Sequence, residues 1–127
     1  MMRVLLKSKL HRVTVTQTEL HYEGSCAVDE ALLEAADLRE YERVDIYNVN
    51  TGQRFSTYVV RAPRGSGTVC VMGAAARLAS AGDRLIVAAY ASFDATELET
   101  HKPRVVLVDE KNHLVEVKSA SAGLPRP

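Results

Sequence analysis

The dipeptide Gly24-Ser25, inside the stretch LHYEGSC, joins two residue types that allow a peptide bond to cleave itself. Glycine has no side chain, so the hydroxyl of the serine that follows it can approach the glycine carbonyl closely. Attack by the Ser25 Oγ on the Gly24 carbonyl turns the amide into an ester, provided that a neighbouring donor stabilises the oxyanion on the Gly24 oxygen. The plain alternative is a Gly-Ser turn without any chemistry.

Other chemistry at Ser25 has less support from the spacing. A serine hydrolase often carries G-x-S-x-G at a strand-to-helix turn, whereas the order here is EGSC. A triad with His11 or His21 as the base stays open, because triad residues are brought together in space rather than in sequence. The four histidines show no H-x-x-x-H spacing, and Cys26 and Cys70 form no C-x-x-C pair. We therefore expect no metal site and two reduced cysteines that pack as small apolar residues.

The elements that must hold this dipeptide in place are mostly strands. Stretches that alternate with a period of two, or are rich in β-branched and aromatic residues, are HRVTVTQT, RVDIYNV, FSTYVV, TVCVM, RLIVAAY and RVVLVD. Turn-forming residues separate them at 50–52, 63–67, 81–83 and 110–112. This pattern predicts a compact, mainly β structure in the form of a barrel.

Two stretches with helical features interrupt the strands. In VDEALLEAADL the apolar residues recur at helical spacing behind Asp29, which predicts an N-cap followed by acids in the first turn. GAAARLAS contains small residues with high helix propensity, enough for about two turns. The end of the chain, SASAGLPRP, is small, polar and proline-bearing, so we predict a loose tail over residues 118–127.

Composition limits the class of protein. With 127 residues, 46% of them hydrophobic and 25% charged, the chain is the size of one globular domain that can bury a core. Sixteen lysines and arginines balance sixteen acids, so the chain lacks the positive field that non-specific nucleic-acid binding needs. The apolar run near the N-terminus is too short for a signal peptide, and no segment is long enough to span a membrane. We expect a cytoplasmic protein with neither a nucleic-acid nor a membrane partner.

Several motifs occur together in a fixed order. LHYEGS is followed by NVNTGQRFSTY, by an RGSG turn, and by GAAARL with GDRLIV behind it. In these motifs and their spacing the chain closely resembles the pyruvoyl-dependent aspartate 1-decarboxylase family. The resemblance covers residues 1–117 and leaves only the tail outside. It implies a single double-psi β-barrel domain with short helices, which agrees with the strand-rich pattern.

The resemblance implies an inactive proenzyme that cuts itself between Gly24 and Ser25. The products are a β chain, residues 1–24, and an α chain, residues 25–127, whose first residue carries a covalent pyruvoyl group derived from Ser25. This ketone supplies the electron sink that pyridoxal phosphate supplies elsewhere, so neither pyridoxal phosphate nor a metal is implied. The implied reaction converts L-aspartate to β-alanine and CO2 for pantothenate and coenzyme A biosynthesis. The implied assembly is a homotetramer with active sites between adjacent subunits.

Roles in catalysis carry over to matching residues. Tyr58 matches the proton donor, a role that suits a phenol because it stays protonated at neutral pH. Thr57 matches the threonine that polarises the scissile Gly24 carbonyl and later contacts substrate. Without the resemblance, both would be ordinary strand residues. Adjacent residues on a regular strand point to opposite faces of the sheet. For Thr57 and Tyr58 both to act, either a bulge must turn them to one face or they must serve the active sites of different subunits. His11 and Tyr22 lie in matching stretches and are assigned supporting roles.

Substrate-binding roles also carry over. Lys9 and Arg54 match basic substrate contacts, and the planar fork of arginine suits a carboxylate. Each would otherwise be a solvated surface charge. The family segment that lines the substrate pocket is matched here by Gly73, Ala74 and Ala75. Their small side chains let backbone N–H groups approach an anion. The plain alternative for this segment is a short helix in the core.

The chain departs from the family pattern at two positions. Met72 stands where the family usually has an asparagine, and a methionine side chain cannot form the hydrogen bonds of an asparagine. Arg77 stands where a histidine is common. The alternative reading that Met72 favours is a double-psi barrel that never cleaves and acts as a binding or regulatory module. Self-cleavage remains the expectation, because Gly24, Ser25, Thr57 and Tyr58 are all present.

Overall fold

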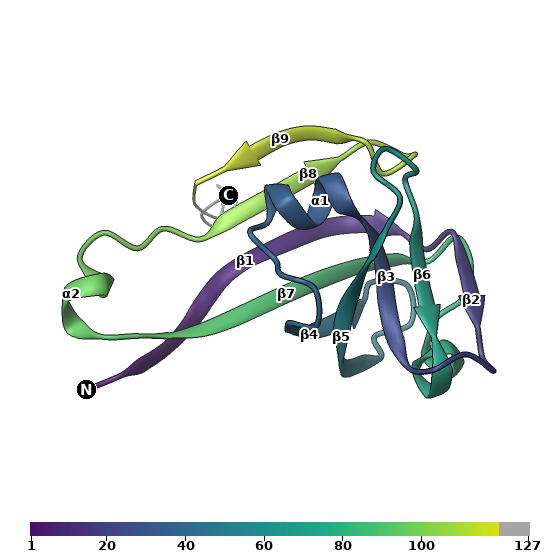
Figure 1. Ribbon diagram of the computed structural model, residues 1–127, viewed down its shortest axis with the longest axis horizontal. Helices are drawn as coiled ribbons and strands as arrows, with labels where there is room; N and C mark the ends of the chain where they lie inside the picture. The colour runs from purple at the N-terminus through teal and green to yellow at the C-terminus, as the bar shows by residue number, and fades with distance from the viewer. Residues whose placement is uncertain (120–127) are drawn as a thin grey trace, which may run out of the picture.

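The computed structural model describes residues 1–119 and consists mainly of β-strands (Figure 1). The strands are β1 (Arg3–Thr14), β2 (Gln17–Glu19), β3 (Ser25–Asp29), β4 (Arg43–Asn48), β5 (Arg54–Ala62), β6 (Val69–Met72), β7 (Arg84–Phe93), β8 (Arg104–Val108) and β9 (Leu114–Lys118). Within the described residues they form one sheet in the order β2-β6-β3-β5-β4-β7-β1-β8-β9. This confirms the predicted mainly β class and the double-psi β-barrel.

The predicted strand stretches all contain strands, and the predicted turns all lie between strands. The period-two pattern fails to predict β3 and β9. Four of the five residues of β3 are buried, on both faces of the sheet, so its sequence SCAVD does not alternate. Strand β9, LVEVK at the edge of the sheet, is exposed along its whole length, so its burial does not alternate, and its short V-E-V-K pattern was missed. Strand β1 also begins at Arg3, well before the predicted HRVTVTQT stretch.

Strand β3 is central to one end of the molecule. It pairs in parallel with β5 and antiparallel with β6, and β2 pairs with the far side of β6. In Figure 1 these strands stand together on the right, while β1 and β7 run the length of the molecule as a long ribbon. Strand β1 lies between β7, to which it is antiparallel, and β8, to which it is parallel.

The core between these strands is built mainly from valine, leucine and isoleucine side chains. Both cysteines are free and buried, as predicted. Cys26 pairs with Val71 and Cys70 pairs with Ala27, so the two sulfur atoms point to opposite faces of the β3–β6 pair. Burial raises the pKa of the Cys26 thiol to about 12, which keeps it protonated and unreactive.

The two predicted helical stretches are both short helices. Helix α1 (Glu30–Ala35) is capped by Asp29 as predicted, while GAAARL forms a 3-10 helix, η1 (Gly73–Leu78), rather than an α-helix. A third helix, α2 (Ala95–Leu98), begins at an Asp94 capping box and was not predicted because it has only four residues. Within residues 1–119, no helix has the length and hydropathy of a transmembrane span. The predicted tail starts inside β9 at Lys118, and from residue 120 it lies outside the described residues.

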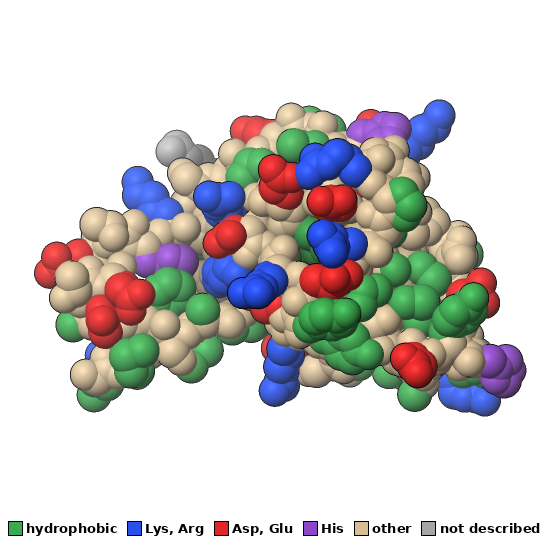
Figure 2. Space-filling view, in the orientation of Figure 1, with side chains coloured by type: hydrophobic (Ala, Val, Ile, Leu, Met, Phe, Trp, Pro, Cys, Tyr) green, Lys and Arg blue, Asp and Glu red, His purple; other side chains and the backbone are tan. Residues whose placement is uncertain are grey.

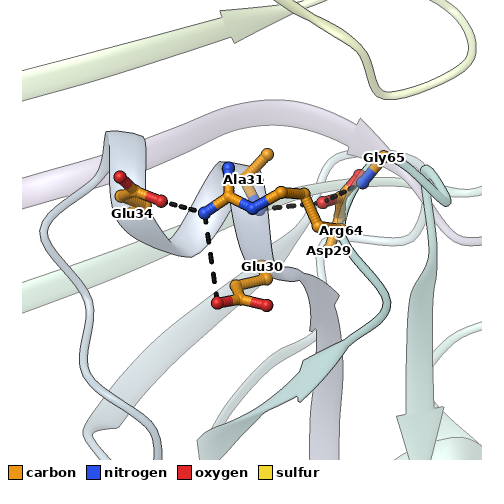
Figure 3. Close-up of polar contacts among 6 residues, drawn as sticks. All are labelled: Asp29, Glu30, Ala31, Glu34, Arg64 and Gly65. Carbon is orange, nitrogen blue, oxygen red and sulfur yellow. Dashed lines mark hydrogen bonds and ion pairs between the residues drawn. The ribbon is translucent and has the colours of Figure 1, made fainter.

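The carboxylate of Asp29 ties the end of β3 to two other segments (Figure 3). Its Oδ1 accepts hydrogen bonds from the backbone N–H of Ala31 at 2.8 Å and of Gly65 at 3.0 Å, and its Oδ2 accepts one from Gly67 at 2.9 Å. The first bond caps α1, and the other two fix the loop between β5 and β6. Figure 3 also shows Arg64 of this loop, which pairs with the carboxylates of α1. One side chain at the end of β3 therefore fixes both helix α1 and the loop that joins the two strands beside β3.

Candidate active site

The Gly24-Ser25 bond lies where the chain enters β3. Gly24 is exposed, but the Ser25 side chain is only 4% exposed although it is polar. Ser25 pairs directly with Met72 on β6, so these two side chains lie on the same face of the sheet about 4.5–5.5 Å apart at their Cβ atoms. None of the hydrogen bonds found among residues 1–119 involves the Ser25 hydroxyl, so its oxygen is available as a nucleophile.

Gly73, the first residue of η1, packs directly on the backbone at Gly24. Its φ of +73° favours glycine, and a Cβ added there would meet the Gly24 Cα at 2.5 Å, the Gly24 nitrogen at 2.8 Å and the Tyr22 oxygen at 3.2 Å. Any side chain at position 73 would therefore push on the Gly24-Ser25 segment. The structure thus places Gly73 beside the reactive dipeptide, while Ala74 is exposed and Ala75 is half-buried.

Tyr58 and Ser25 face the same side of the β3–β5 pair. Cys26 is in register with Val59, and both are fully buried. Because side chains alternate along each strand, Ser25 and Tyr58 point to the opposite face from these two. Tyr58 is 39% exposed, so its phenol borders solvent beside the dipeptide.

Thr57 does not share this face. The register between β4 and β5 runs without a shift through Thr57 and Tyr58, which pair with Val44 and Arg43. No bulge therefore turns the two side chains to one side, and they point to opposite faces of β5. Of the two arrangements that the sequence allowed, the bulge is absent from β5.

Arg54 lies at the start of β5, on the order of 13 Å along the strand from Tyr58. Its guanidinium stacks over the Tyr47 ring, 4.1 Å from the centroid, and the Tyr47 hydroxyl hydrogen-bonds to the Tyr90 hydroxyl at 2.9 Å. The bond to Tyr90, with burial, raises the pKa of Tyr47 to about 12, so its ring stays neutral beneath the cation. Sequence reasoning missed Tyr47, although an aromatic residue that precedes an arginine across a short hairpin is a recognisable stacking signal.

Lys9 lies farther from the dipeptide in the order of the sheet. It is on β1, where it pairs with Ala88 and Val105, and strands β5, β4 and β7 lie between β1 and β3. Within a single chain, the predicted substrate contacts therefore lie apart from Ser25 on β3: Lys9 is on β1, and Arg54 is the first residue of β5. By contrast, the predicted cleavage residues Gly24 and Ser25 lie at the start of β3, and Tyr58 lies on the adjacent strand β5.

His11 and His21 are the histidines that a serine hydrolase at Ser25 would need as its base. Burial, with the nearby positive charges of Lys9, Arg12 and Lys118, lowers the pKa of His11. Neither His11 nor His21 makes a hydrogen bond to Ser25 in the part of the chain that the structure describes. The same residues contain no group of histidine, cysteine and carboxylate side chains able to hold a metal ion.

Two hollows on the described surface are lined by residues other than Ser25. A hollow of about 530 Å³ lies between α1 and the turn before β4, and its lining includes Tyr41 and Arg61. Another, of about 360 Å³, includes Arg54 and Tyr47 in its lining. Figure 2 shows one face of the molecule, on which green apolar patches alternate with blue and red charged groups.

Comparison with known proteins identifies the family of the chain. The model of the aspartate decarboxylase family matches residues 1–115. An aspartate 1-decarboxylase of Laribacter hongkongensis is 59% identical over 125 residues, which are 98% of this chain and 96% of that protein. The aspartate 1-decarboxylase of Methylobacillus flagellatus is 62% identical over 114 residues, 90% of each chain, and that of Chromobacterium violaceum is 57% identical over 98% of this chain and 99% of that protein. The chain belongs to the aspartate decarboxylase family.

Proposed function

We propose that the protein decarboxylates L-aspartate to β-alanine and CO2, the step that provides β-alanine for pantothenate and coenzyme A, by means of a pyruvoyl group made from its own Ser25. The observation that carries this proposal is the Gly24-Ser25 bond itself. In a member of this family it enters β3 with a nearly buried serine and with Gly73 packed against it. We place the reaction in the cytoplasm, where free cysteines such as Cys26 and Cys70 are ordinary.

The first stage is self-cleavage of the chain. The Ser25 Oγ attacks the Gly24 carbonyl, an ester bond forms between them, and the bond from Gly24 to the Ser25 nitrogen breaks. Loss of the Ser25 α-proton then expels the Gly24 carboxylate and leaves a carbon–carbon double bond at residue 25. Water replaces the nitrogen, which departs as ammonia, and a ketone remains. The products are residues 1–24 and 25–127.

The residues around the dipeptide fit this chemistry. Within residues 1–119 no hydrogen bond holds the nearly buried Ser25 hydroxyl away from the carbonyl, and the absent side chain at Gly73 leaves room beside Gly24 for its carbonyl carbon to become tetrahedral. We assign Thr57 the role of polarising the Gly24 carbonyl. Since its side chain points to the opposite face of β5 from Tyr58, we assign this role to Thr57 toward the Gly24 of an adjacent subunit.

The pyruvoyl ketone, once formed, supplies the sink for the electrons that CO2 leaves on the α-carbon of aspartate. Tyr58 then supplies the proton that this carbon takes up, because its phenol faces the same side as residue 25. Lys9 and Arg54 bind the carboxylates of aspartate, with Ala74 and Ala75 in the pocket wall. The stacking on Tyr47 fixes the plane of the Arg54 guanidinium for a two-point contact with a carboxylate.

We further propose a homotetramer whose active sites lie between adjacent subunits. Support comes from the separation of Lys9 and Arg54 from Ser25 along the sheet of one chain. A neighbouring subunit that brings its Arg54 or Lys9 to Ser25 completes the set of residues. The same arrangement accounts for Thr57 and Tyr58, which face opposite sides of β5 and can serve different sites.

The proposal is tested with the intact mass of purified protein and with Ser25→Ala. The wild-type protein should yield two fragments that meet at 24 and 25, and borohydride should add two hydrogens to the ketone of the larger one. Ser25→Ala should remain a folded single chain without β-alanine production, whereas Ser80→Ala, an exposed serine, should behave as wild type. Decarboxylation by the Ser25→Ala protein would refute the assigned electron sink.

A second candidate function is a binding or regulatory module that never cleaves. It is favoured by Met72, which faces Ser25 directly across β3 and β6 and offers no hydrogen bond. A wild-type chain that stays at full length after prolonged warm incubation, with no β-alanine formed, would support this candidate over the decarboxylase.

A further inference from the structure

Tyr41 has a backbone conformation that tyrosine rarely adopts. Its φ is +74°, in the left-handed region where glycine, asparagine and aspartate are the usual residues. The conformation is fixed from both sides, since the Tyr41 N–H donates to the Val59 carbonyl at 2.7 Å and the Glu42 carbonyl accepts from the Val59 N–H at 3.1 Å. The turn before β4 is thereby bonded to β5 at the residue next to Tyr58.

A strained aromatic residue persists only when its surroundings compensate. Burial does not compensate here, because Tyr41 is 72% exposed. Its contact is with another aromatic ring: the centroid of Tyr41 lies 6.3 Å from that of Tyr58, and the ring planes are tilted by 49°. This separation and tilt lie within the favourable range for aromatic pairs. The observation therefore points to the Tyr58 ring as the reason for a tyrosine at position 41.

Tyr58 has few other groups to hold its ring. It is 39% exposed, and its cross-strand neighbour Arg43 directs its guanidinium to Ser56 and Asp45, at 3.4 and 4.0 Å. A partly exposed tyrosine on a strand can occupy more than one χ1 rotamer. The Tyr41 ring, packed on one side of the Tyr58 ring, excludes some of these rotamers. The phenol oxygen of Tyr58 is therefore held in fewer positions.

We propose that Tyr41 is a positioning residue for Tyr58, holding the phenol in the orientation from which it donates its proton at residue 25. This inference rests on the proposed function, in which Tyr58 is the proton donor. Tyr41 does not contact the reacting atoms; it acts through its ring on the Tyr58 ring. Tyr41 also lines the hollow of about 530 Å³ beside this turn, and its aromatic contact is with Tyr58.

The test compares Tyr41→Asn with Tyr41→Phe. Asparagine accepts a positive φ but has no ring, so Tm should stay equal or rise while kcat falls about three- to tenfold, with KM within twofold and self-cleavage complete. Phenylalanine keeps the ring, so its kcat should match wild type. The opposed changes in Tm and kcat separate positioning from loss of folding. A Tyr41→Asn protein with wild-type kcat would overturn the inference.

Tyr58→Phe separates this inference from the proposed function. If Tyr58→Phe loses turnover and Tyr41→Asn has no further effect in that background, the two residues act in one pathway, as proposed. If Tyr58→Phe keeps full turnover, the assignment of Tyr58 as proton donor fails. The packing of the two rings can be measured independently of activity from the rate at which tetranitromethane nitrates Tyr58, followed by peptide mass. This nitration rate should rise in Tyr41→Asn. An unchanged rate would show that the Tyr41 ring does not cover Tyr58.

Discussion

At the scale of single residues, the side chain that pairs with Ser25 across the sheet determines which hydrogen bonds are available at the Gly24-Ser25 bond. That side chain belongs to Met72, which pairs with Ser25 between β3 and β6. Methionine fills space and can neither donate to an oxyanion nor orient a hydroxyl. An asparagine at this position would place an amide group against the Gly24-Ser25 bond.

We therefore predict that Met72→Asn accelerates self-cleavage by roughly tenfold or more, since one donor aimed at a developing oxyanion has an effect of this order or larger. The rate is measured from the loss of intact chain in samples taken after synthesis and resolved on denaturing gels. Met72→Leu, which is apolar and similar in volume, is the matched control and should cleave at the wild-type rate. Equal rates for all three proteins would show that residue 72 has no part in cleavage.

At the scale of elements, the Asp29 carboxylate fixes helix α1 and the loop between β5 and β6 at once. Asp29→Ala should lower the free energy of unfolding by ~2–4 kcal/mol, because it removes a helix cap and leaves two further N–H groups without acceptors. Asp94 caps α2 on the surface in a similar way. Asp94→Ala should cost about 0.5–1 kcal/mol in urea unfolding, and equal costs for the two variants would contradict the role given to Asp29.

The same carboxylate makes stability depend on pH. Burial raises the pKa of Asp29, but the N–H donors of Gly67, Gly65 and Ala31, together with Arg64, outweigh burial and leave the pKa below its ordinary value. A depressed pKa stabilises the fold above the unfolded value of about 4, and this contribution is lost as the pH falls through the folded value. Urea midpoints should therefore fall less steeply below pH 4 in Asp29→Ala than in wild type.

Comparison of elements also shows what the sequence could predict. The amphipathic strands and the Asp29 cap follow from period and residue type alone. Strand β3, which carries Ser25, does not follow from them, since a strand buried on both faces has no alternation. The candidate site was assigned through motifs, and among its residues Gly73 and Tyr58 lie beside the dipeptide. Tyr41 was missed because its role depends on a contact with β5 that no local pattern records.

At the scale of the whole molecule, Asn112 joins segments that are distant in the sequence. Its Oδ1 accepts from the Thr14 N–H, and its Nδ2 donates to the carbonyls of Thr14 and Gly67, all at 2.8 Å. The end of β1, the loop before β6 and the β8–β9 turn are thus fixed to one buried side chain. These contacts lie on either side of the proposed cleavage point.

Strand β1 has β7 on one flank and β8 on the other, and β2 is paired with β6. All these partner strands follow residue 25. We predict that the cleaved pieces co-elute on a sizing column in native buffer, separate only in denaturant, and lose structure in one transition. Native mass spectrometry checks the first outcome, and release of residues 1–24 without denaturant would contradict it.

The place of β1 inside the sheet makes refolding a different problem before and after cleavage. An uncut chain recovers β1 by a unimolecular search, at a rate that does not depend on protein concentration. Once the chain is in two pieces, the larger one has a slot between β7 and β8 that only a separate peptide of 24 residues can fill, so recovery becomes second order. After the proposed cleavage, the rate at which the protein refolds from the denatured state should therefore fall as the protein is diluted.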